Sequence, residues 1–217
     1  PDAVLQRASQ KKPKVIFLCS PNNPTANRQN TLTIKAILEK FNGLVVVDEA
    51  YVDFSAEASL IPLLNEYPNL VVMQTLSKAW GLAGIRLGMA FASAELISYM
   101  MRVKPPYNVN ALTQQAALKA LSKPEYMHET VETLLAERER VANALREKSG
   151  IKRVFSSDAN FLLVRIPHAR YIYEKLAESG IIVRFRGDQL HCDDGLRITI
   201  GTRQENDALL EELDKLL

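Results

Sequence analysis

The stretch T-L-S-K-A-W-G-L-A-G-I-R, from Thr75 to Arg86, decides how the rest of this sequence is interpreted. It follows the apolar run L-V-V-M from Leu70 to Met73, which is typical of a strand buried on both faces. Binding sites of α/β proteins are built where such strands end. The stretch therefore predicts a functional loop that leaves a buried strand.

Runs rich in β-branched residues alternate with helical patterns through the first half of the chain. Runs of this kind, separated by helix-like segments such as Leu32 to Phe41, are typical of a three-layer α/β fold with a mostly parallel sheet. The expected strands are Val15 to Cys19, Leu44 to Asp48, Leu70 to Thr75 and Ile85 to Ala92. Because the chain begins almost directly with a central-looking strand, we expect the sheet to be incomplete at the front.

The second half predicts a different architecture. A long helical pattern over Pro124 to Lys148 ends before Gly150 and is interpreted as a connecting helix. Residues 1–123 are thus expected to form the partial large domain, 124–150 the connecting helix and 151–217 a smaller α+β domain. Within the last part, the expected strands are Asn160 to Arg165, Ile181 to Arg184 and Leu196 to Ile200. The expected helices are Tyr171 to Ser179 and Glu205 to Leu217.

The composition of the chain makes several classes of protein unexpected. Apolar residues make up 47% and charged residues 24% of 217 residues, with a net charge of +2, so neither disorder nor a nucleic-acid partner is expected. Cys19 and Cys192 lie far apart without a metal-binding spacing, which indicates no disulfide framework and no metal site. No run is long enough to span a membrane and the first residues do not resemble a signal peptide, so we expect a cytoplasmic protein.

Lys78 is the candidate nucleophile. An amine that emerges from an apolar strand can lose part of its hydration, which suits Schiff-base chemistry. Thr75, Ser77 and Arg86 offer hydroxyl groups and a planar cation, which together match a phosphate group. The alternative is a solvated lysine on a turn, with Arg86 in a surface ion pair.

Two further strand ends carry polar groups. Asp48 ends the run L-V-V-V-D, and Tyr51 follows in the loop. A carboxylate can hold a heterocyclic nitrogen protonated, and a phenol can bind a ring oxygen. Asn23 lies in S-P-N-N-P-T, whose prolines make a rigid turn. Taken singly, these residues could be a helix cap, a packed aromatic and a turn, but their order along the chain favours one site.

The ordered motifs N-P-T, D-x-x-Y and S-K-x-x-x-x-x-x-x-R resemble those of the fold-type-I pyridoxal-phosphate aminotransferases along the whole chain. The resemblance implies that Lys78 forms the Schiff base with pyridoxal 5'-phosphate and then moves protons. It implies that Asp48 pairs with the pyridine nitrogen. By the same resemblance Asn23 and Tyr51 bind the ring oxygen, and the phosphate is held by Thr75, Ser77 and Arg86.

The closer resemblance is to the histidinol-phosphate aminotransferases, through C-S-P-N-N-P-T, V-D-E-A-Y and L-R-I-T-I-G-T-R. It implies amino transfer between L-histidinol phosphate and 2-oxoglutarate, which becomes glutamate. It also implies that the intact enzyme is a homodimer. Arg197, at the start of its strand, would bind the substrate carboxylate, and Arg184 the substrate phosphate. A fork of two donors suits a carboxylate, although each arginine could instead lie in a surface ion pair.

The sequence departs from the family in two places. The family usually reads N-P-T-G, whereas Ala26 follows Thr25 here, so a left-handed backbone at Ala26 would be strained. The family's N-terminal portion has no counterpart, so we expect this chain alone to be weakly active or inactive. Two alternatives stay open: a related decarboxylase acting on a phosphorylated amino acid, and a folded module without cofactor.

Overall fold

The computed structural model describes all residues from Pro1 to Leu217, which form two compact units. The first unit comprises Pro1–Asn22 and Arg28–Met127, and the second comprises Asn23–Asn27 and His128–Leu217. Helix α5 (Pro124–Glu147) contains the point at which the chain passes from one unit to the other. None of the helices is long and apolar enough to cross a membrane.

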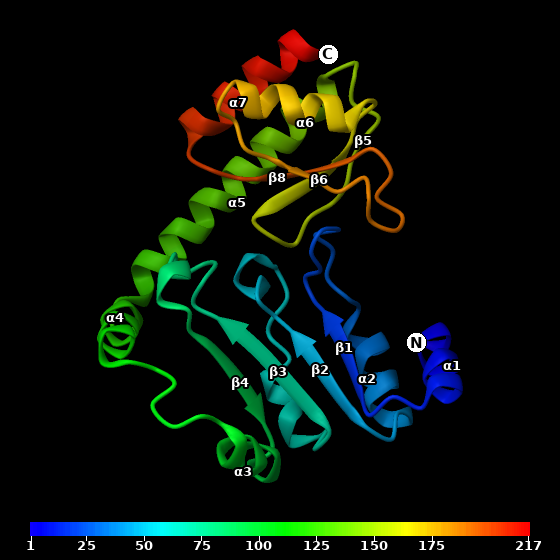
Figure 1. Ribbon diagram of the computed structural model, residues 1–217, viewed down its shortest axis with the longest axis vertical. Helices are drawn as coiled ribbons and strands as arrows, with labels where there is room; N and C mark the ends of the chain where they lie inside the picture. The colour runs from blue at the N-terminus through cyan, green and yellow to red at the C-terminus, as the bar shows by residue number, and fades with distance from the viewer. The chain divides into compact units, whose positions relative to one another are not determined.

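The first unit is built on a four-stranded sheet in the order β1-β2-β3-β4 (Figure 1). Strands β1 (Val15–Cys19), β2 (Leu44–Asp48) and β3 (Leu70–Thr75) are parallel and have the predicted bounds. Strand β4 (Gly88–Ala92) is antiparallel to β3 and begins later than predicted. The difference arises because the short 3-10 helix η3 (Ala83–Ile85) precedes it.

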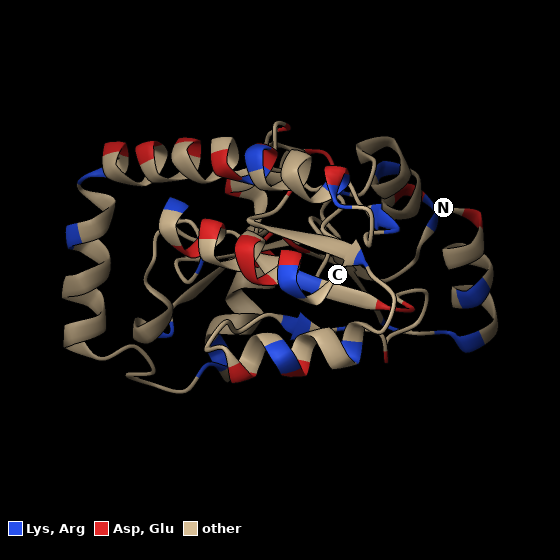
Figure 2. Cartoon of the chain, turned by 90° about the horizontal axis from the view of Figure 1, so that it is seen from above, with Lys and Arg blue, Asp and Glu red and all other residues tan.

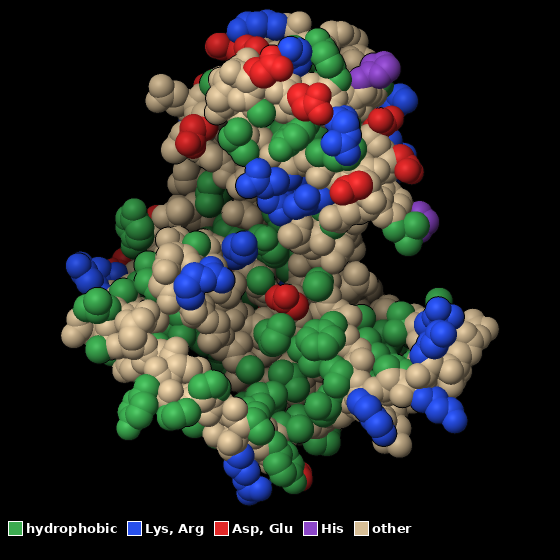
Figure 3. Space-filling model, viewed as in Figure 1, with side chains coloured by type: hydrophobic (Ala, Val, Ile, Leu, Met, Phe, Trp, Pro, Cys, Tyr) green, Lys and Arg blue, Asp and Glu red, His purple; other side chains and the backbone are tan.

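The two faces of this sheet differ. Helix α2 (Thr31–Lys40) and helix η2 (Ile61–Asn65) pack against alternate residues such as Val45, Val47 and Val72, which are fully buried. The opposite face carries Phe17, which is 66% exposed. Apolar side chains gather on the face of this unit seen in Figure 3. Register and strand alternation place Asp48 and Thr75 on the same face as Phe17.

Three helices were not predicted from the sequence. They are α1 (Asp2–Lys11), α3 (Ala94–Val103) and α4 (Ala111–Leu121). Helix α1 precedes β1, which has the predicted bounds and is an edge strand of this sheet. Helices α1 and α3 bury no residue. The helical spacing of the apolar residues Leu96, Ile97 and Met100 could have signalled α3. Polar caps could have signalled both α3 and α4, since Ser93 and Asn110 each accept a backbone N–H bond.

The second unit has an antiparallel sheet in the order β5-β6-β8-β7. Its strands are β5 (Arg153–Val154), β6 (Phe161–Arg165), β7 (Arg184–Phe185) and β8 (Gly195–Thr199). Helices α5, α6 (Ala169–Glu178) and α7 (Arg203–Leu216) contribute to one core with Leu162, Val164 and Ile198. Alternate residues of β6 and β8 build this core, so helices cover one face of the sheet.

The predicted strand from Ile181 to Arg184 was wrong. Gly180 has φ +79° and the Ile181 N–H donates to the Leu176 carbonyl at 2.8 Å, so these residues end α6. Pairing with β8 begins only at Arg184. An apolar run of this length does not distinguish a strand from a connection, because the pairing partner lies elsewhere in the sequence.

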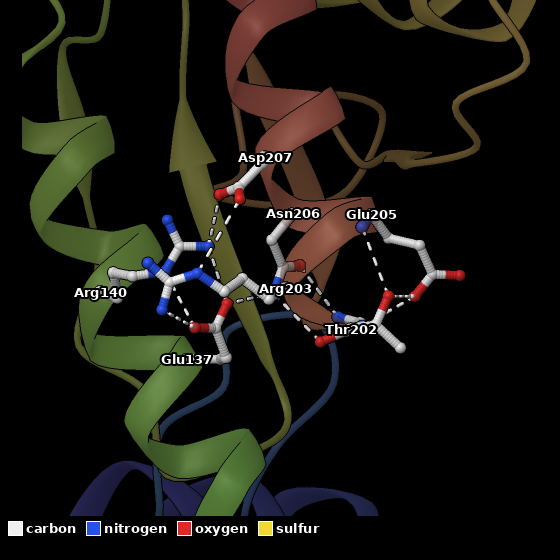
Figure 4. A network of polar contacts seen from close by, with 8 residues as sticks. Glu137, Arg140, Thr202, Arg203, Glu205, Asn206 and Asp207 are labelled. Carbon is white, nitrogen blue, oxygen red and sulfur yellow. Dashed lines mark hydrogen bonds and ion pairs between the residues drawn. The ribbon is translucent and has the colours of Figure 1, made fainter.

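A polar network joins α5 to α7 in the second unit (Figure 4). Arg140 donates two hydrogen bonds to Glu137, at 2.9 and 2.8 Å, and pairs with Asp207 at 2.7 Å. Asn206 is 2% exposed and donates to both Glu137 and the Gly201 carbonyl. The bonds from Arg140 lower the pKa of Glu137 to about 2 against its desolvation, and Asn206 adds to the lowering. In Figure 2, acidic residues, red on the ribbon, recur on successive turns of α5.

Candidate functional site

The loop between β3 and β4 presents Lys78. The Leu76 N–H donates to the Leu87 carbonyl at 3.2 Å, and the Gly81 N–H donates to the Lys78 carbonyl at 2.9 Å. Gly81 has φ +67°, a conformation that a residue with a side chain adopts at a cost. These bonds fold residues 76–87 into a compact turn at the carboxyl end of β3.

Lys78 is exposed, so the expected partial loss of hydration was wrong for this chain. The physical reason is its place in the turn, beyond the last paired residue of β3. Its ammonium lies over the ring of Tyr51, 5.1 Å from the ring centroid. The geometry therefore joins two of the predicted site residues by a cation–π contact.

The predicted phosphate-binding residues lie in the same turn. The Thr75 hydroxyl is 2.9 Å from the Ser77 hydroxyl and accepts the Ser77 backbone N–H at 3.1 Å. Arg86 is exposed and lies in the left-handed region at φ 55°, where its guanidinium donates to the Ala83 carbonyl at 3.0 Å. Hydroxyl groups, a backbone N–H and a guanidinium are the donors that bind phosphate in proteins.

Asp48 is the last residue of β2, and Tyr51 follows in the loop. The Asp48 carboxylate accepts the Ala50 N–H at 3.0 Å, which fixes its orientation, while Tyr51 is only 8% exposed. Because β2 and β3 are parallel neighbours, Asp48 lies at the same edge of the sheet as Thr75. Cys19 lies opposite Asp48 on β1, and its thiol pKa is raised by burial and by the Asp48 charge.

Asn23 belongs to the second unit, together with Arg197. The Asn23 side-chain oxygen accepts a hydrogen bond from Arg197 Nη1 at 2.9 Å. Arg197 is the third residue of β8, which begins and ends one residue earlier than the predicted strand from Leu196 to Ile200. The Arg197 guanidinium also lies 5.1 Å from the ring centroid of Phe161.

Arg184 and Arg197 are direct partners across β7 and β8. Partners in an antiparallel pair point to the same face, and like charges placed in this way repel each other. Arg184 is exposed and donates to the Val183 carbonyl at 3.3 Å. An anion bound between the two guanidinium groups would relieve their repulsion.

Ala26 has the left-handed backbone that the sequence predicted to be strained, with φ 63°. Its side chain is fully buried, and its carbonyl accepts the Asp158 N–H at 2.8 Å. The peptide bond between Asn23 and Pro24 is cis. Burial of the methyl group offsets part of the cost of this conformation, which Gly would adopt freely.

Sequence reasoning missed Glu49, the neighbour of Asp48. Glu49 is 1% exposed and accepts hydrogen bonds from Ser59, Leu60 and Gln74. The only available signal was its place in an apolar strand end, and nothing local distinguishes it from a solvated acid.

Comparison with known proteins gives the class of protein. The family model of aminotransferase class I and II matches residues 2–213, so the chain belongs to this family. Its fold is that of the fold-type-I pyridoxal-phosphate aminotransferases, as the sequence predicted.

Individual relatives indicate which members of this family the chain resembles. Histidinol-phosphate aminotransferase of Parabacteroides distasonis is 50% identical over 215 residues, covering 99% of this chain and 62% of that protein. The structure of histidinol-phosphate aminotransferase from Sinorhizobium meliloti in complex with pyridoxal-5'-phosphate gives a TM-score of 0.90 at 24% identity, covering 100% of this chain and 61% of the other. A decarboxylase from Sulfurospirillum multivorans gives 0.88 at 26% identity, with 100% and 65% covered. The chain thus spans about three fifths of these relatives.

The donor set of the first unit fits the cofactor of this family. Pyridoxal phosphate carries an aldehyde, a pyridine nitrogen and a phosphate. The structure offers an exposed amine at Lys78, a carboxylate at Asp48 and the hydroxyl pair Thr75 and Ser77. Each group of the cofactor thus has a chemical counterpart at the carboxyl edge of one sheet.

Proposed function

We propose that this chain is the cofactor-binding and C-terminal part of a histidinol-phosphate aminotransferase. In this proposal the complete enzyme transfers an amino group between L-histidinol phosphate and 2-oxoglutarate. The observation that carries it is the arrangement of Lys78, Tyr51 and Asp48 at the ends of β2 and β3. Relatives that carry this name, 45–50% identical over nearly the whole chain, support the choice of substrate.

Each site residue has a proposed task. Bound pyridoxal phosphate supplies an aldehyde and a ring that accepts electrons from the substrate. Lys78 supplies the attacking amine and afterwards moves a proton at the substrate carbon. Asp48, oriented by the Ala50 N–H, keeps the ring nitrogen protonated. Tyr51 donates its hydroxyl to the ring oxygen.

Anion recognition completes the proposal. Thr75, Ser77 and Arg86 would bind the cofactor phosphate. Arg197 would bind the substrate carboxylate, and Asn23, which already accepts a bond from it, would share this task and bind the ring oxygen. Arg184 would bind the phosphate of histidinol phosphate, since its pairing with Arg197 leaves two cations on one face.

The test combines spectroscopy with product analysis. On addition of pyridoxal phosphate, the chain should gain a visible absorbance band that borohydride abolishes. Lys78→Ala should lack the band, whereas the surface control Lys119→Ala should keep it. A chain without the band would be a folded module without cofactor, and the proposal would fail.

A second candidate function is decarboxylation of a phosphorylated amino acid. It is favoured by the likeness to the decarboxylase, which is 26% identical. The two reactions differ in product, because a decarboxylase releases carbon dioxide without consuming an oxo acid. We expect a longer chain, which carries the remaining portion, to catalyse amino transfer that depends on glutamate. Release of carbon dioxide instead would favour the decarboxylase.

Assembly and location belong to the same proposal. We propose a homodimer in the cytoplasm, and turnover by the 217-residue chain alone far below that of a full-length protein. Exposed apolar side chains support association, among them Tyr99, Met101, Val103 and Tyr107. Both cysteines are free, in keeping with a reducing compartment. Sedimentation of the longer chain as a monomer, or equal turnover by the two chains, would contradict these points.

A further inference from the structure

Adjacent acids at the end of β2 point to opposite faces of the first sheet. Asp48 is paired with Met73 on the less covered face. Glu49, one residue further, points to the face that α2 and η2 cover, where it is 1% exposed. Burying a carboxylate is costly unless hydrogen bonds replace its water, so its surroundings indicate what it does.

Three uncharged donors satisfy Glu49. The Ser59 hydroxyl donates at 2.5 Å, the Leu60 N–H at 2.8 Å and the Gln74 amide at 3.0 Å. Gln74 also donates to the Ser59 hydroxyl at 3.1 Å, which closes the cluster. The carboxylate thereby joins the end of β2 to β3 and to the loop before η2.

The backbone of Glu49 leads directly to the proposed site. The Glu49 N–H donates to the Met73 carbonyl at 2.8 Å, and the Glu49 carbonyl accepts the Val52 N–H at 3.0 Å. Between these anchors lies the Ala50 N–H that holds the Asp48 carboxylate. Tyr51, whose ring lies beneath the Lys78 ammonium, is the next residue.

We propose that Glu49 is a positioning residue, which fixes the turn from Asp48 to Tyr51 so that the Asp48 carboxylate and the Tyr51 ring meet the cofactor. This inference rests on the proposed function, because it concerns how that site binds pyridoxal phosphate. The alternative is that Glu49 only stabilises the fold. The two roles predict different results for a Glu49 variant. A positioning residue changes the affinity for the cofactor by more than the loss of stability explains, whereas a residue that only stabilises the fold does not.

The experiment titrates pyridoxal phosphate into the 217-residue chain and follows the absorbance of the bound form. Glu49→Ala should weaken binding about tenfold, since it removes all three hydrogen bonds that fix the turn through the carboxylate. Gln74→Ala removes one donor without touching residues 48–51 and should weaken binding about threefold. Exchange of the Ala50 amide proton should accelerate in both variants.

Ile34→Val is the matched control. Ile34 is 1% exposed in the core under the same sheet, and the substitution should lower the stability of the fold because it removes one buried methyl group. Its affinity for pyridoxal phosphate should stay within about twofold of the original. Should Glu49→Ala fail to fold, Glu49→Gln replaces it, because the amide keeps the side-chain volume, and about threefold weaker binding is expected.

Two results would overturn the inference in distinguishable ways. If the unaltered chain binds and the Glu49 variants bind equally well, or if Ile34→Val weakens binding as much as they do, Glu49 only stabilises the fold. If the unaltered chain binds no pyridoxal phosphate, the proposed function fails and the inference fails with it.

Discussion

A charged network between α5 and α7 and the turn that follows β3 use charged residues in opposite ways. In the second unit, Glu137, Arg140 and Asp207 bind one another and Asn206 connects them to the loop before α7 (Figure 4). In the first unit, Lys78 and Arg86 are exposed; Arg86 donates to a carbonyl of its own turn, and Lys78 lies over an aromatic ring. One set of charges is paired within the fold, and the other is exposed and, in the proposed function, binds the cofactor.

This difference explains how burial separates structural from functional polar groups. Groups that stabilise a fold are buried and fully hydrogen-bonded, because leaving one partner without the other is costly. Groups that await a ligand cannot be satisfied in this way. Substitutions should therefore change stability in the second unit and ligand binding at the ends of β2 and β3.

The largest expected effect on stability is that of Asn206→Ala. The side chain exchanges two hydrogen bonds with the backbone of Gly201, at 3.0 Å each, and donates to Glu137 at 2.9 Å. Its loss removes the Asn206 bonds to the Gly201 N–H and carbonyl and one of the bonds to Glu137, so the free energy of unfolding should fall by roughly 2–3 kcal/mol. Denaturant unfolding followed by circular dichroism measures it.

Asn143→Ala is the control for that substitution. Asn143 lies on α5 and only accepts an exposed bond from Arg146. We expect a change below about 0.5 kcal/mol. Equal effects of the two alanine variants would show that the network does not stabilise the second unit.

A smaller effect should appear in the dependence of the free energy of unfolding on pH. The Arg140 hydrogen bonds lower the pKa of Glu137 from 4.5 to about 2. A lowered pKa means that the unfolded chain takes up the proton first, so this stabilisation is complete above about pH 4.5 and is lost as pH falls towards 2. Glu137→Gln should flatten this part of the stability profile, whereas Glu132→Gln should not. An unchanged slope in Glu137→Gln would contradict the assignment.

The smallest effect on stability should come from the candidate site. Lys78 is exposed and its contact with the Tyr51 ring is a cation–π interaction, so Lys78→Ala should change the free energy of unfolding by less than about 1 kcal/mol. Thermal unfolding compared with that of Lys119→Ala checks this. A loss comparable to that of Asn206→Ala would mean that Lys78 serves the fold.

Local sequence predicted those parts of the fold that depend on local patterns. The apolar runs of β1, β2 and β3 gave their bounds because strands beside covered layers need continuous apolar residues. Helix α3 was missed although two local signals mark it, the helical spacing of Leu96, Ile97 and Met100 and the cap Ser93. Strand β7 is defined only by its pairing with β8, which no local pattern contains.

The candidate site could be proposed as far as strand ends and family motifs could be recognised. Asp48 and Thr75 were proposed because each ends a buried run, and Arg197 because the motif around it resembles that of the aminotransferase family. Glu49 could not be found, since its partners Ser59 and Gln74 are 10 and 25 residues away. The exposure of Lys78 was misjudged because hydration depends on the turn and not on the strand before it.

The most direct test of the central claim, that Lys78 is the amine that pyridoxal phosphate modifies, is mass spectrometry of the borohydride-reduced protein with peptide mapping. We predict one added pyridoxyl-phosphate group per chain, located on the peptide that contains Lys78. The label should be absent from Lys78→Ala and reduced in Asp48→Ala. A reduced protein without the added mass, or with the label spread over surface lysines, would contradict the account.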